Sequence, residues 1–386
     1  MTEWKECTIA DLGMVVGGAT PSTKDPENYD GGMIPWITPK DLSNYSDRYI
    51  SRGERNITEK GLNGCSTQLM PRHSVLFTSR APIGYIAIAD NEVCTNQGFK
   101  SVVPNEQTDY LFLYYLLKFN KEKIEGLGSG TTFKEVSGST MRGITVKVPK
   151  SLDVQRAIGR YLDSIDTKIE INRRINENLQ EQAQAIYHHM IIENADAAWT
   201  PGVLSDIAVI TMGQSPKGES YNEDGVGTVF FQGRAEFGFR FPTRRLYTTD
   251  PKRMAQANDA LMSIRAPVGD MNVAYEDCCI GRGLGAIRSK DGHQSFVLYT
   301  MFALREQLNV FNGEGTVFGS INRDALNSMP VDIPPKEIMD QFEDIVAPMD
   351  AAIRNNYDEI CRLQAMRDSL LPRLMSGELD VSDIDL

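Results

Sequence analysis

An internal duplication is the feature that most restricts what this chain can fold into. The segment S-R-A-P-I-G at 79–84 returns as I-R-A-P-V-G at 264–269, 185 positions later. G-S-G-T-T-F at 128–133 returns as G-E-G-T-V-F at 313–318, at the same offset. Self-similarity over such a distance indicates that two copies of one structural unit make up the chain.

Each copy starts with a segment of mixed secondary structure. Short β-rich runs lead to an apolar helix, predicted at 109–124 in the first copy and 294–310 in the second. A closing strand follows, at 144–148 and 329–333. We therefore expect an α+β protein with two similar mixed α/β domains, at 1–150 and 199–335.

Each copy then continues into a long helix, at 151–198 and 336–380, before an acidic tail at 381–386. Apolar residues recur there every seven positions over about five heptads, which is typical of a coiled coil. The alternative is that each helix packs only on its own domain. The predicted seam consists of Ile158, Leu162, Ile165, Ile169, Asn172, Leu179, Ile186, Phe342, Val346, Met349, Ile353, Asn356, Ile360, Leu363 and Leu370.

Two asparagines interrupt this seam. Asn172 and Asn356 are 184 positions apart, the offset that also relates Ile165 to Met349. If the helices pack antiparallel about a pseudo-two-fold axis, the two amides should meet at the crossing point and fix the register. Alternatively, both face solvent where the helices separate.

The net charge of −12 is unfavourable for a protein that binds nucleic acid alone. The charge is uneven, however: 1–150 contains 17 basic and 17 acidic residues, whereas 336–386 contains 5 basic and 12 acidic residues. The acidic excess thus lies mostly on the helical segments. A chain of this kind needs a basic partner to hold DNA.

Other sequence features point to a reader rather than an enzyme. There is no phosphate-binding glycine loop, methyltransferase N-P-P-Y run, serine elbow or zinc-ligand spacing. We expect no catalytic residue, bound cofactor or metal. The six cysteines form no C-x-x-C pair, and no apolar run is long enough for a membrane span, so we expect a cytoplasmic location.

Candidate DNA contacts are basic residues interleaved with aromatic ones, because arginine is the commonest bidentate reader of base edges. In the first domain they are Lys40, Arg48, Arg52, Arg55 and Lys134; in the second they are Arg234, Arg240, Arg244 and Arg245. Arg80 and Arg265 occupy the repeated R-A-P element. Because both copies keep them, we interpret those two as scaffold or phosphate contacts.

In these motifs the chain resembles the specificity subunits of type I restriction-modification systems. The resemblance covers essentially the whole chain. It rests on the W-K-x-x-x-I-A-D-L opening, the G-G-A-T-P-S run at 17–22, the R-A-P elements, Val148-Pro149 followed by Q-R-A-I at 155–158, and L-L-P-R-L-M-S-G-E-L at 370–379.

The resemblance implies two target-recognition domains joined by antiparallel helices, with each domain reading one half of a split DNA target. It also implies two modification subunits carrying S-adenosylmethionine, and restriction subunits that use ATP and Mg²⁺. Three alternatives remain: a related methylation-based defence system without the type I motor, an unrecognised enzyme with duplicated sites, and a protein scaffold with no DNA role.

Overall fold

The computed structural model describes residues 2–130, 134–196, 199–313 and 319–381. The chain divides into two compact units, Met1–Arg173 with Tyr357–Leu386, and Arg174–Asn356. Each unit contains one mixed domain and one half of each of two long helices, α6 (Leu152–Tyr187) and α11 (Lys336–Ser376). Most of the repeated glycine element at 128–133 and 313–318, and nearly all of the acidic tail, lie outside the described residues.

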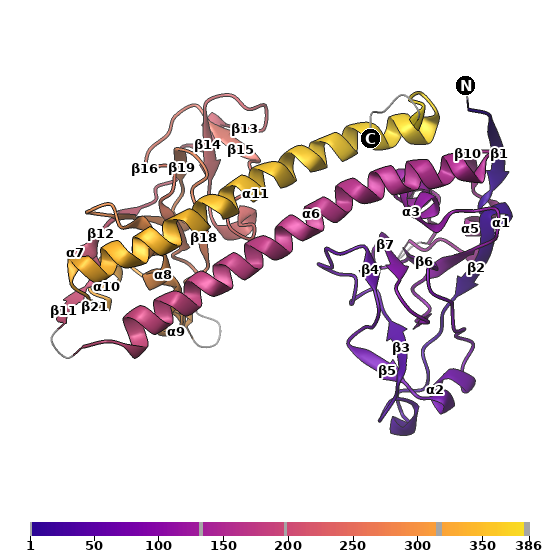
Figure 1. Cartoon of the computed structure of the whole chain (residues 1–386), viewed down its shortest axis with the longest axis horizontal. Coiled ribbons are helices and arrows are strands. Elements are labelled where there is room, and N and C mark those ends of the chain that lie inside the picture. Colours follow the sequence, from indigo (N-terminus) through magenta and orange to yellow (C-terminus); the bar gives the residue numbers. More distant parts are fainter. Residues whose placement is uncertain (1, 131–133, 197–198, 314–318, 382–386) are drawn as a thin grey trace. The chain divides into compact units, whose positions relative to one another are not determined.

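Unit 1 is built on a five-stranded sheet in the order β2-β9-β6-β7-β4 and a three-stranded sheet in the order β5-β3-β8. Its N-terminal strand β1 pairs antiparallel with β10. In Figure 1, β3 and β5 lie at the end of the unit remote from α6. The strands are β1 (Trp4–Thr8), β2 (Gly13–Gly17), β3 (Ile34–Ile37), β4 (Tyr49–Ile50), β5 (Arg55–Ile57), β6 (Val75–Ser79), β7 (Ile83–Ala89), β8 (Cys94–Thr95), β9 (Lys100–Pro104) and β10 (Thr145–Pro149).

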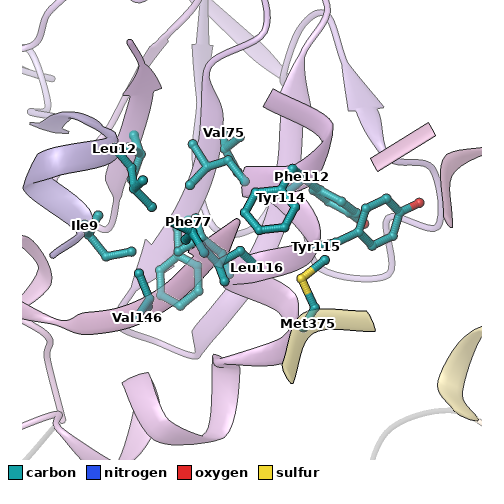
Figure 2. Close-up of a cluster of buried hydrophobic side chains, with 14 of the residues drawn as sticks. Ile9, Leu12, Val75, Phe77, Phe112, Tyr114, Tyr115, Leu116, Val146 and Met375 are labelled. Atoms are coloured by element: carbon teal, nitrogen blue, oxygen red, sulfur yellow. The ribbon is translucent and has the colours of Figure 1, made fainter. Parts of the chain in front are cut away.

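The core of unit 1 forms around α3, whose sequence Y-L-F-L-Y-Y-L-L-K-F is apolar on every side. Such a helix must be covered all round, and Figure 2 shows Phe112 and Leu116 packed among Val75, Phe77 and Met375. Met375 belongs to α11, so the C-terminal end of the chain completes this core. The short helices are α1 (Ile9–Leu12), α2 (Glu59–Asn63), α3 (Tyr110–Phe119), α4 (Lys121–Gly126) and α5 (Gly138–Gly143).

Unit 2 repeats this plan with two sheets in the orders β12-β20-β17-β18 and β13-β15-β14-β19-β16, and with β11 pairing with β21. Its strands are β11 (Thr200–Val203), β12 (Ala208–Met212), β13 (Tyr221–Asn222), β14 (Thr228–Phe231), β15 (Leu246–Thr248), β16 (Met254–Ala255), β17 (Ala260–Ser263), β18 (Met271–Val273), β19 (Cys278–Ile280), β20 (Leu284–Ser289) and β21 (Pro330–Ile333). Its helices are α7 (Leu204–Ile207), α8 (Gln294–Ala303), α9 (Arg305–Asn309) and α10 (Arg323–Asn327).

The repeated R-A-P-[IV]-G element ends in a similar turn in both units. Both alanine-proline bonds, Ala81-Pro82 and Ala266-Pro267, are cis. The glycine that ends each turn has a positive φ, +94° at Gly84 and +90° at Gly269, a conformation that side chains with a Cβ rarely adopt. A glycine is therefore kept at the end of each turn because of its positive φ, and the predicted α+β duplication is confirmed.

Within each unit, the halves of α6 and α11 run antiparallel. In unit 1, Ile165 and Ile169 pack with Ile360, whereas Ile158 and Leu162 belong to the core of the domain. The heptad seam is thus shared between the partner helix and the domain. Of the remaining predicted seam residues, Phe342, Val346, Ile353 and Asn172 are buried, and Leu179, Ile186, Met349, Asn356, Leu363 and Leu370 are half-buried.

The ends of the long helices α6 and α11 depend on the residues that follow each helix. Regular α-helix ends at Tyr187 and a π-helical turn continues from His188 to Glu193, short of the predicted boundary at 198. The second helix ends at Ser376, before Gly377 with φ +78°. A Cβ at Gly377 would lie 2.6 Å from the Trp4 indole nitrogen, so glycine both terminates the helix and allows the close approach of β1.

The two seam asparagines each donate a hydrogen bond to another side chain. Asn172 donates a hydrogen bond of 2.7 Å to Glu359 Oε2 in unit 1. In unit 2, Asn356 donates to Asn176 Oδ1 at 2.9 Å, and Asn176 donates to the carbonyl oxygen of Ile353 at 3.3 Å. Each asparagine thus has a partner within its own unit, and their predicted meeting at the crossing point stays a prediction. The alternative of two solvent-facing amides is wrong, since Asn172 is 1% exposed. Seven-residue spacing identified the polar positions but not which of several neighbouring amides would pair.

The Asn176–Asn356 pair gives a first testable prediction. Replacing either residue alone with leucine should lower the free energy of unfolding by about 1 kcal/mol, because the remaining amide loses its partner. Replacing both should cost less than the two single changes together, with a coupling of about 0.5–1 kcal/mol in a double-mutant cycle. Urea denaturation of the four proteins measures this coupling, and additive costs would contradict the pairing.

Candidate nucleic-acid interface

Five of the basic candidates in the first domain lie at its surface, exposed or half-exposed: Lys40, Arg52, Arg55, Arg80 and Lys134. Lys40 Nζ is 2.6 Å from Glu54 Oε2, and Arg80 Nη1 is 3.5 Å from Glu135 Oε2. The Arg55 guanidinium lies 4.0 Å from the ring centre of Tyr29. These residues remain open to a ligand in solution, because their contacts are themselves at the surface.

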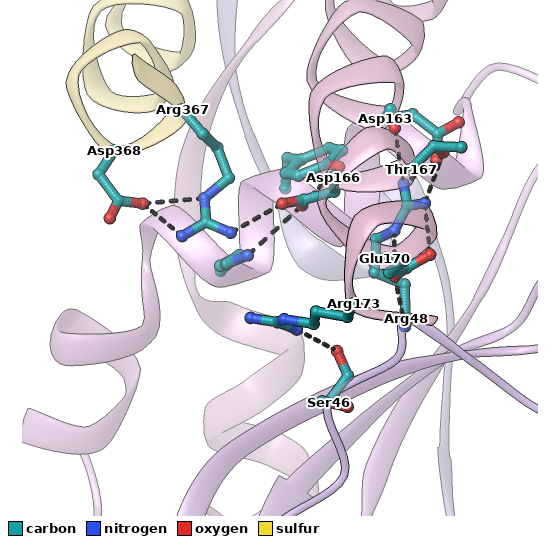
Figure 3. Close-up of polar contacts among 11 residues, drawn as sticks. Ser46, Arg48, Asp163, Asp166, Thr167, Glu170, Arg173, Arg367 and Asp368 are labelled. Carbon is teal, nitrogen blue, oxygen red and sulfur yellow. Dashed lines mark hydrogen bonds and ion pairs between the residues drawn. The ribbon is translucent and has the colours of Figure 1, made fainter. Parts of the chain in front are cut away.

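Arg48 does not face solvent, which corrects its assignment as a DNA contact. The residue is 4% exposed. Its guanidinium binds Glu170 of α6 through two hydrogen bonds, Nε–Oε1 at 2.9 Å and Nη2–Oε2 at 3.0 Å. It also donates to Thr167 Oγ1 at 2.7 Å and pairs with the Asp163 carboxylate (Figure 3). Arg48 therefore fastens the first domain to its helix.

The pKa shifts of Arg48 and Asp163 agree with the attachment of the first domain to α6 by this ion pair. Burial lowers the pKa of Arg48, but the hydrogen bond and charge of Glu170, together with the charge of Asp163, outweigh burial and hold that pKa above its ordinary value. Burial also raises the pKa of Asp163, and Arg48 opposes that rise. The cation and its carboxylates depend on one another, because each would be a buried charge alone.

In the second domain, three candidate arginines are paired at the surface with acidic neighbours. Arg234 Nη1 lies 2.5 Å from Asp270, Arg244 Nε lies 2.5 Å from Glu276, and Arg245 Nη2 lies 2.7 Å from Glu236. Each side chain is about half exposed. A DNA phosphate or base edge would have to compete with these carboxylates. Arg265 is exposed, and its backbone forms a bridge with Ser320.

Arg240 is also buried, which corrects its assignment as a DNA contact. It is 3% exposed and pairs with Asp350 of α11, while Nη1 donates to Gln180 Oε1 of α6 at 3.2 Å. Tyr299 completes the group, since its hydroxyl donates to Asp350 Oδ1 at 3.0 Å. Arg240 thus fastens the second domain to the halves of both long helices in unit 2, and its replacement would disturb this attachment rather than remove a base contact.

The two buried arginines are structural counterparts. The carbonyl oxygen of Arg48 accepts a hydrogen bond from Ile88 N at 2.7 Å, and that of Arg240 accepts one from Val273 N at 2.9 Å. Ile88 and Val273 are 185 positions apart, the offset of the duplication. Each domain is therefore attached to the helices by an arginine from the same place in the fold, followed in both copies by an aromatic residue.

A tyrosine and an aspartate repeat beside each arginine. Tyr115 donates to Asp166 Oδ2 at 2.9 Å, as Tyr299 does to Asp350. Sequence reasoning missed these pairs, although both members repeat at an offset of 184. Burial raises the pKa of Asp166, but Lys118 and the hydrogen bond from Arg367 outweigh burial and leave it below its ordinary value. The group around Arg48 consists of Asp163, Thr167 and Glu170, and the group around Arg240 consists of Gln180, Tyr299 and Asp350.

Both domains also contain a cluster of three segments that carries a few exposed polar side chains and is held by matching backbone hydrogen bonds. The loop cluster comprises residues 19–21, 37–38 and 95–99 in the first domain, and 214–216, 231–232 and 280–284 in the second. In the first domain the bonds are Ala19 N–Thr95 O at 3.0 Å, Asn96 N–Ile37 O at 3.0 Å and Phe99 N–Asn96 O at 3.3 Å. In the second they are Gln214 N–Ile280 O at 3.0 Å, Gly281 N–Phe231 O at 2.8 Å and Leu284 N–Gly281 O at 3.0 Å.

A tyrosine hydroxyl braces each loop cluster by donating to a proline carbonyl. Tyr29 binds Pro21 O at 2.7 Å and Tyr221 binds Pro216 O at 2.9 Å. In the second domain the cluster surrounds an open depression of about 440 Å³, lined in part by Gln214, Ser215, Gln232 and Arg282. Neither this cluster nor its counterpart was among the predicted contacts, because these segments contain no run of basic residues.

The described residues contain no group of three histidine, cysteine, aspartate or glutamate side chains arranged to hold a metal ion. No helix in the part of the chain that the structure describes is long and apolar enough to cross a membrane.

Comparisons with known proteins agree with this architecture. The family model for the type I restriction modification DNA specificity domain matches residues 1–181 and 197–361. The type I restriction enzyme MjaIX specificity subunit of Methanocaldococcus jannaschii is 32% identical, over 99% of this chain and 95% of that protein. The EcoR124I/EcoR124II specificity subunit of Escherichia coli is 28% identical over 47% of this chain and 44% of its own length.

A solved structure shows the same fold. The crystal structure of the type I restriction-modification S subunit from M. genitalium matches with a TM-score of 0.63, covering 97% of this chain and 96% of that one. The two sequences are only 17% identical. At this identity the match shows only that the two chains share a fold.

Proposed function

Since the chain belongs to the family of type I restriction-modification DNA specificity subunits, we propose that it reads a split DNA target, one half-site for each mixed domain. The observation that carries this proposal is the repeated attachment of the domains. Two copies of one fold are fastened by equivalent buried arginines, Arg48 to α6 and Arg240 to both α6 and α11, while their surfaces carry different side chains. Such an arrangement suits two readers of different sequence held on a common support.

We further propose that methyltransferase subunits dock on this chain and supply the methyltransferase activity. S-adenosylmethionine would be bound by two modification subunits, and ATP and Mg²⁺ by restriction or translocase subunits. The long helices offer exposed acidic residues for such contacts, among them Glu177, Glu181, Asp344 and Asp368. A chain with net charge −12 would then hold double-stranded DNA tightly only when a basic partner adds its own phosphate contacts.

Reconstitution tests this function. We expect the purified chain to bind DNA weakly, to bind no S-adenosylmethionine, and to have no methyltransferase, nuclease or ATPase activity. Adding its modification subunits should strengthen binding to a split target by about 10³-fold or more over non-specific DNA. That binding should weaken steeply as salt rises.

Fluorescence anisotropy with labelled duplexes and calorimetry with S-adenosylmethionine measure these quantities. Binding of S-adenosylmethionine by the chain alone would overturn its non-catalytic role. Sequencing of methylated bases in DNA treated with the complex should show one split motif with two specific halves. Methylation dependent on a single continuous motif would overturn the two-reader proposal.

A further inference from the structure

We propose that the loop cluster of each domain is the edge that reads DNA bases, and that the exposed side chains differing between the two clusters set the two half-sites. The residues concerned are Gln97 in the first domain and Arg282 and Gln232 in the second. This inference rests on the proposed function and assigns the part of each domain that performs it.

The first ground is that the two clusters share a backbone but differ in side chains. Three backbone hydrogen bonds and the tyrosine brace are equivalent in the two copies. On this common frame Gln97 corresponds to Arg282, both exposed, at the offset of 185. Thr38 corresponds to Gln232 in the same way, since each directly follows the strand residue whose carbonyl accepts a frame hydrogen bond. A frame that keeps its geometry while changing its exposed polar groups suits readers of two different sequences.

The second ground is the chemistry of these side chains. A guanidinium can donate two hydrogen bonds to O6 and N7 of guanine, and a glutamine amide can bind N6 and N7 of adenine. Both groups must approach base edges from rigid backbone if they are to discriminate between bases. The depression around Arg282 is bordered by Gln214 and Gln232, so one arginine and two amides surround a single hollow.

The third ground is that these groups are available for a ligand. Among the residues that the structure describes, the side chains of Arg282, Gln214 and Gln232 form no hydrogen bond or ion pair with the protein. Arg282 uses only its backbone N–H, which donates to Ser215 Oγ at 3.2 Å. By contrast, Arg234 and Arg245 are each paired with carboxylates. These two predicted arginines are thus engaged, whereas the loop cluster of the second domain presents unpartnered donors.

In the first domain the reading group is held in place rather than free. Gln97 Oε1 accepts a hydrogen bond from Thr20 Oγ1 at 2.5 Å. Its amide N–H groups and the second lone pair of Oε1 therefore remain for a base, and its orientation is fixed by a neighbour in the same cluster. We expect Gln97 to read an adenine in one half-site and Arg282 a guanine in the other.

The test uses the complex of the full chain with its modification subunits and compares Arg282→Gln with wild type. We expect Arg282→Gln to change or relax one position in the half-site read by the second domain and to leave the other half-site unchanged. Affinity for the original target should fall roughly 10- to 100-fold. Gln232→Thr, which installs the side chain of Thr38, should relax a neighbouring position of the same half-site.

Arg323→Gln is the matched control, because it removes the same charge from an exposed position of the same domain. Arg323 begins α10, which contacts α7, the helix before β12, whereas the loop cluster follows the other end of β12. Methylated-base sequencing reads the half-sites, and anisotropy at several salt concentrations reads affinity. The control should keep both half-sites and lose less than about 3-fold in affinity.

Two results would overturn the inference. In the first, both half-sites stay intact in Arg282→Gln and Gln232→Thr. In the second, Arg282→Gln weakens binding to every DNA sequence equally and lowers the salt dependence by about one phosphate contact, so that Arg282 contacts the backbone and does not read a base. Failure of the proposed function gives a different result, because the wild-type complex itself would then methylate no split motif.

Discussion

Replacing Arg48 with methionine is expected to lower the free energy of unfolding by about 3 kcal/mol, and no DNA contact would be lost because the side chain is buried. The arginine is 4% exposed and binds two carboxylates of α6. Removing one partner of a buried ion pair is costly because the remaining charges stay buried without compensation. The hydrophobic stem of methionine keeps most of the packing, so the loss reports the charge network. Denaturant unfolding of the purified chain measures it.

Two further variants make the Arg48 result specific. Arg52→Met removes an exposed arginine from the same region and should change stability by less than about 0.5 kcal/mol. Adding Asp163→Asn and Glu170→Gln to Arg48→Met should recover part of the loss, since the uncompensated charges then disappear. If Arg48→Met were as stable as Arg52→Met but failed to recognise one half-site, Arg48 would be a DNA contact after all.

Replacing Phe342 with alanine is expected to destabilise unit 2 by about 3–5 kcal/mol. The side chain is 0% exposed. Its ring makes edge-to-face contacts with Tyr187 of α6 at 5.6 Å and with Tyr299 and Phe296 of α8 at 6.0 and 6.3 Å. The change would open a cavity where two helices and the domain meet, and rigid neighbouring rings would close it poorly.

Hydrogen exchange locates this effect. Amides of α8 and of the unit 2 part of α11 should lose protection in Phe342→Ala, whereas those of β1 and β10 in unit 1 should not. Ile345→Ala on the same helix is the control, because Ile345 is 48% exposed and its truncation should cost under about 1 kcal/mol. A loss in Phe342→Ala no larger than in this control would contradict the packing described.

The sequence predicted those parts of the fold that depend on local pattern. Heptad spacing identified α6 and α11 because an apolar stripe on a helix repeats within a few residues. The duplication was visible because backbone-constrained residues such as Gly84 and Gly269 must be kept in both copies. The domain outline followed from these two observations.

The fate of individual polar side chains could not be predicted in the same way. Arg48 finds Glu170 122 residues away, and Arg240 finds Asp350 at a separation of 110. Whether an arginine faces DNA or a carboxylate depends on tertiary packing that a local run of basic and aromatic residues does not reveal. Asn172 illustrates the same limit, since periodicity placed it in the seam but Glu359 had to be brought close by the fold.

The division of the chain into a continuous and a discontinuous unit has a consequence for its synthesis on the ribosome. Unit 2 is one uninterrupted stretch, whereas unit 1 needs both the first 173 residues and the last 30. Leu371, Leu374 and Met375 complete the unit 1 core, and Asp380 accepts hydrogen bonds from Thr2. Residues of unit 1 are therefore translated both before and after those of unit 2. Until Leu371, Leu374 and Met375 emerge, the unit 1 core lacks these side chains, and a polypeptide that stops before them would contain all of unit 2 but an incomplete unit 1 core.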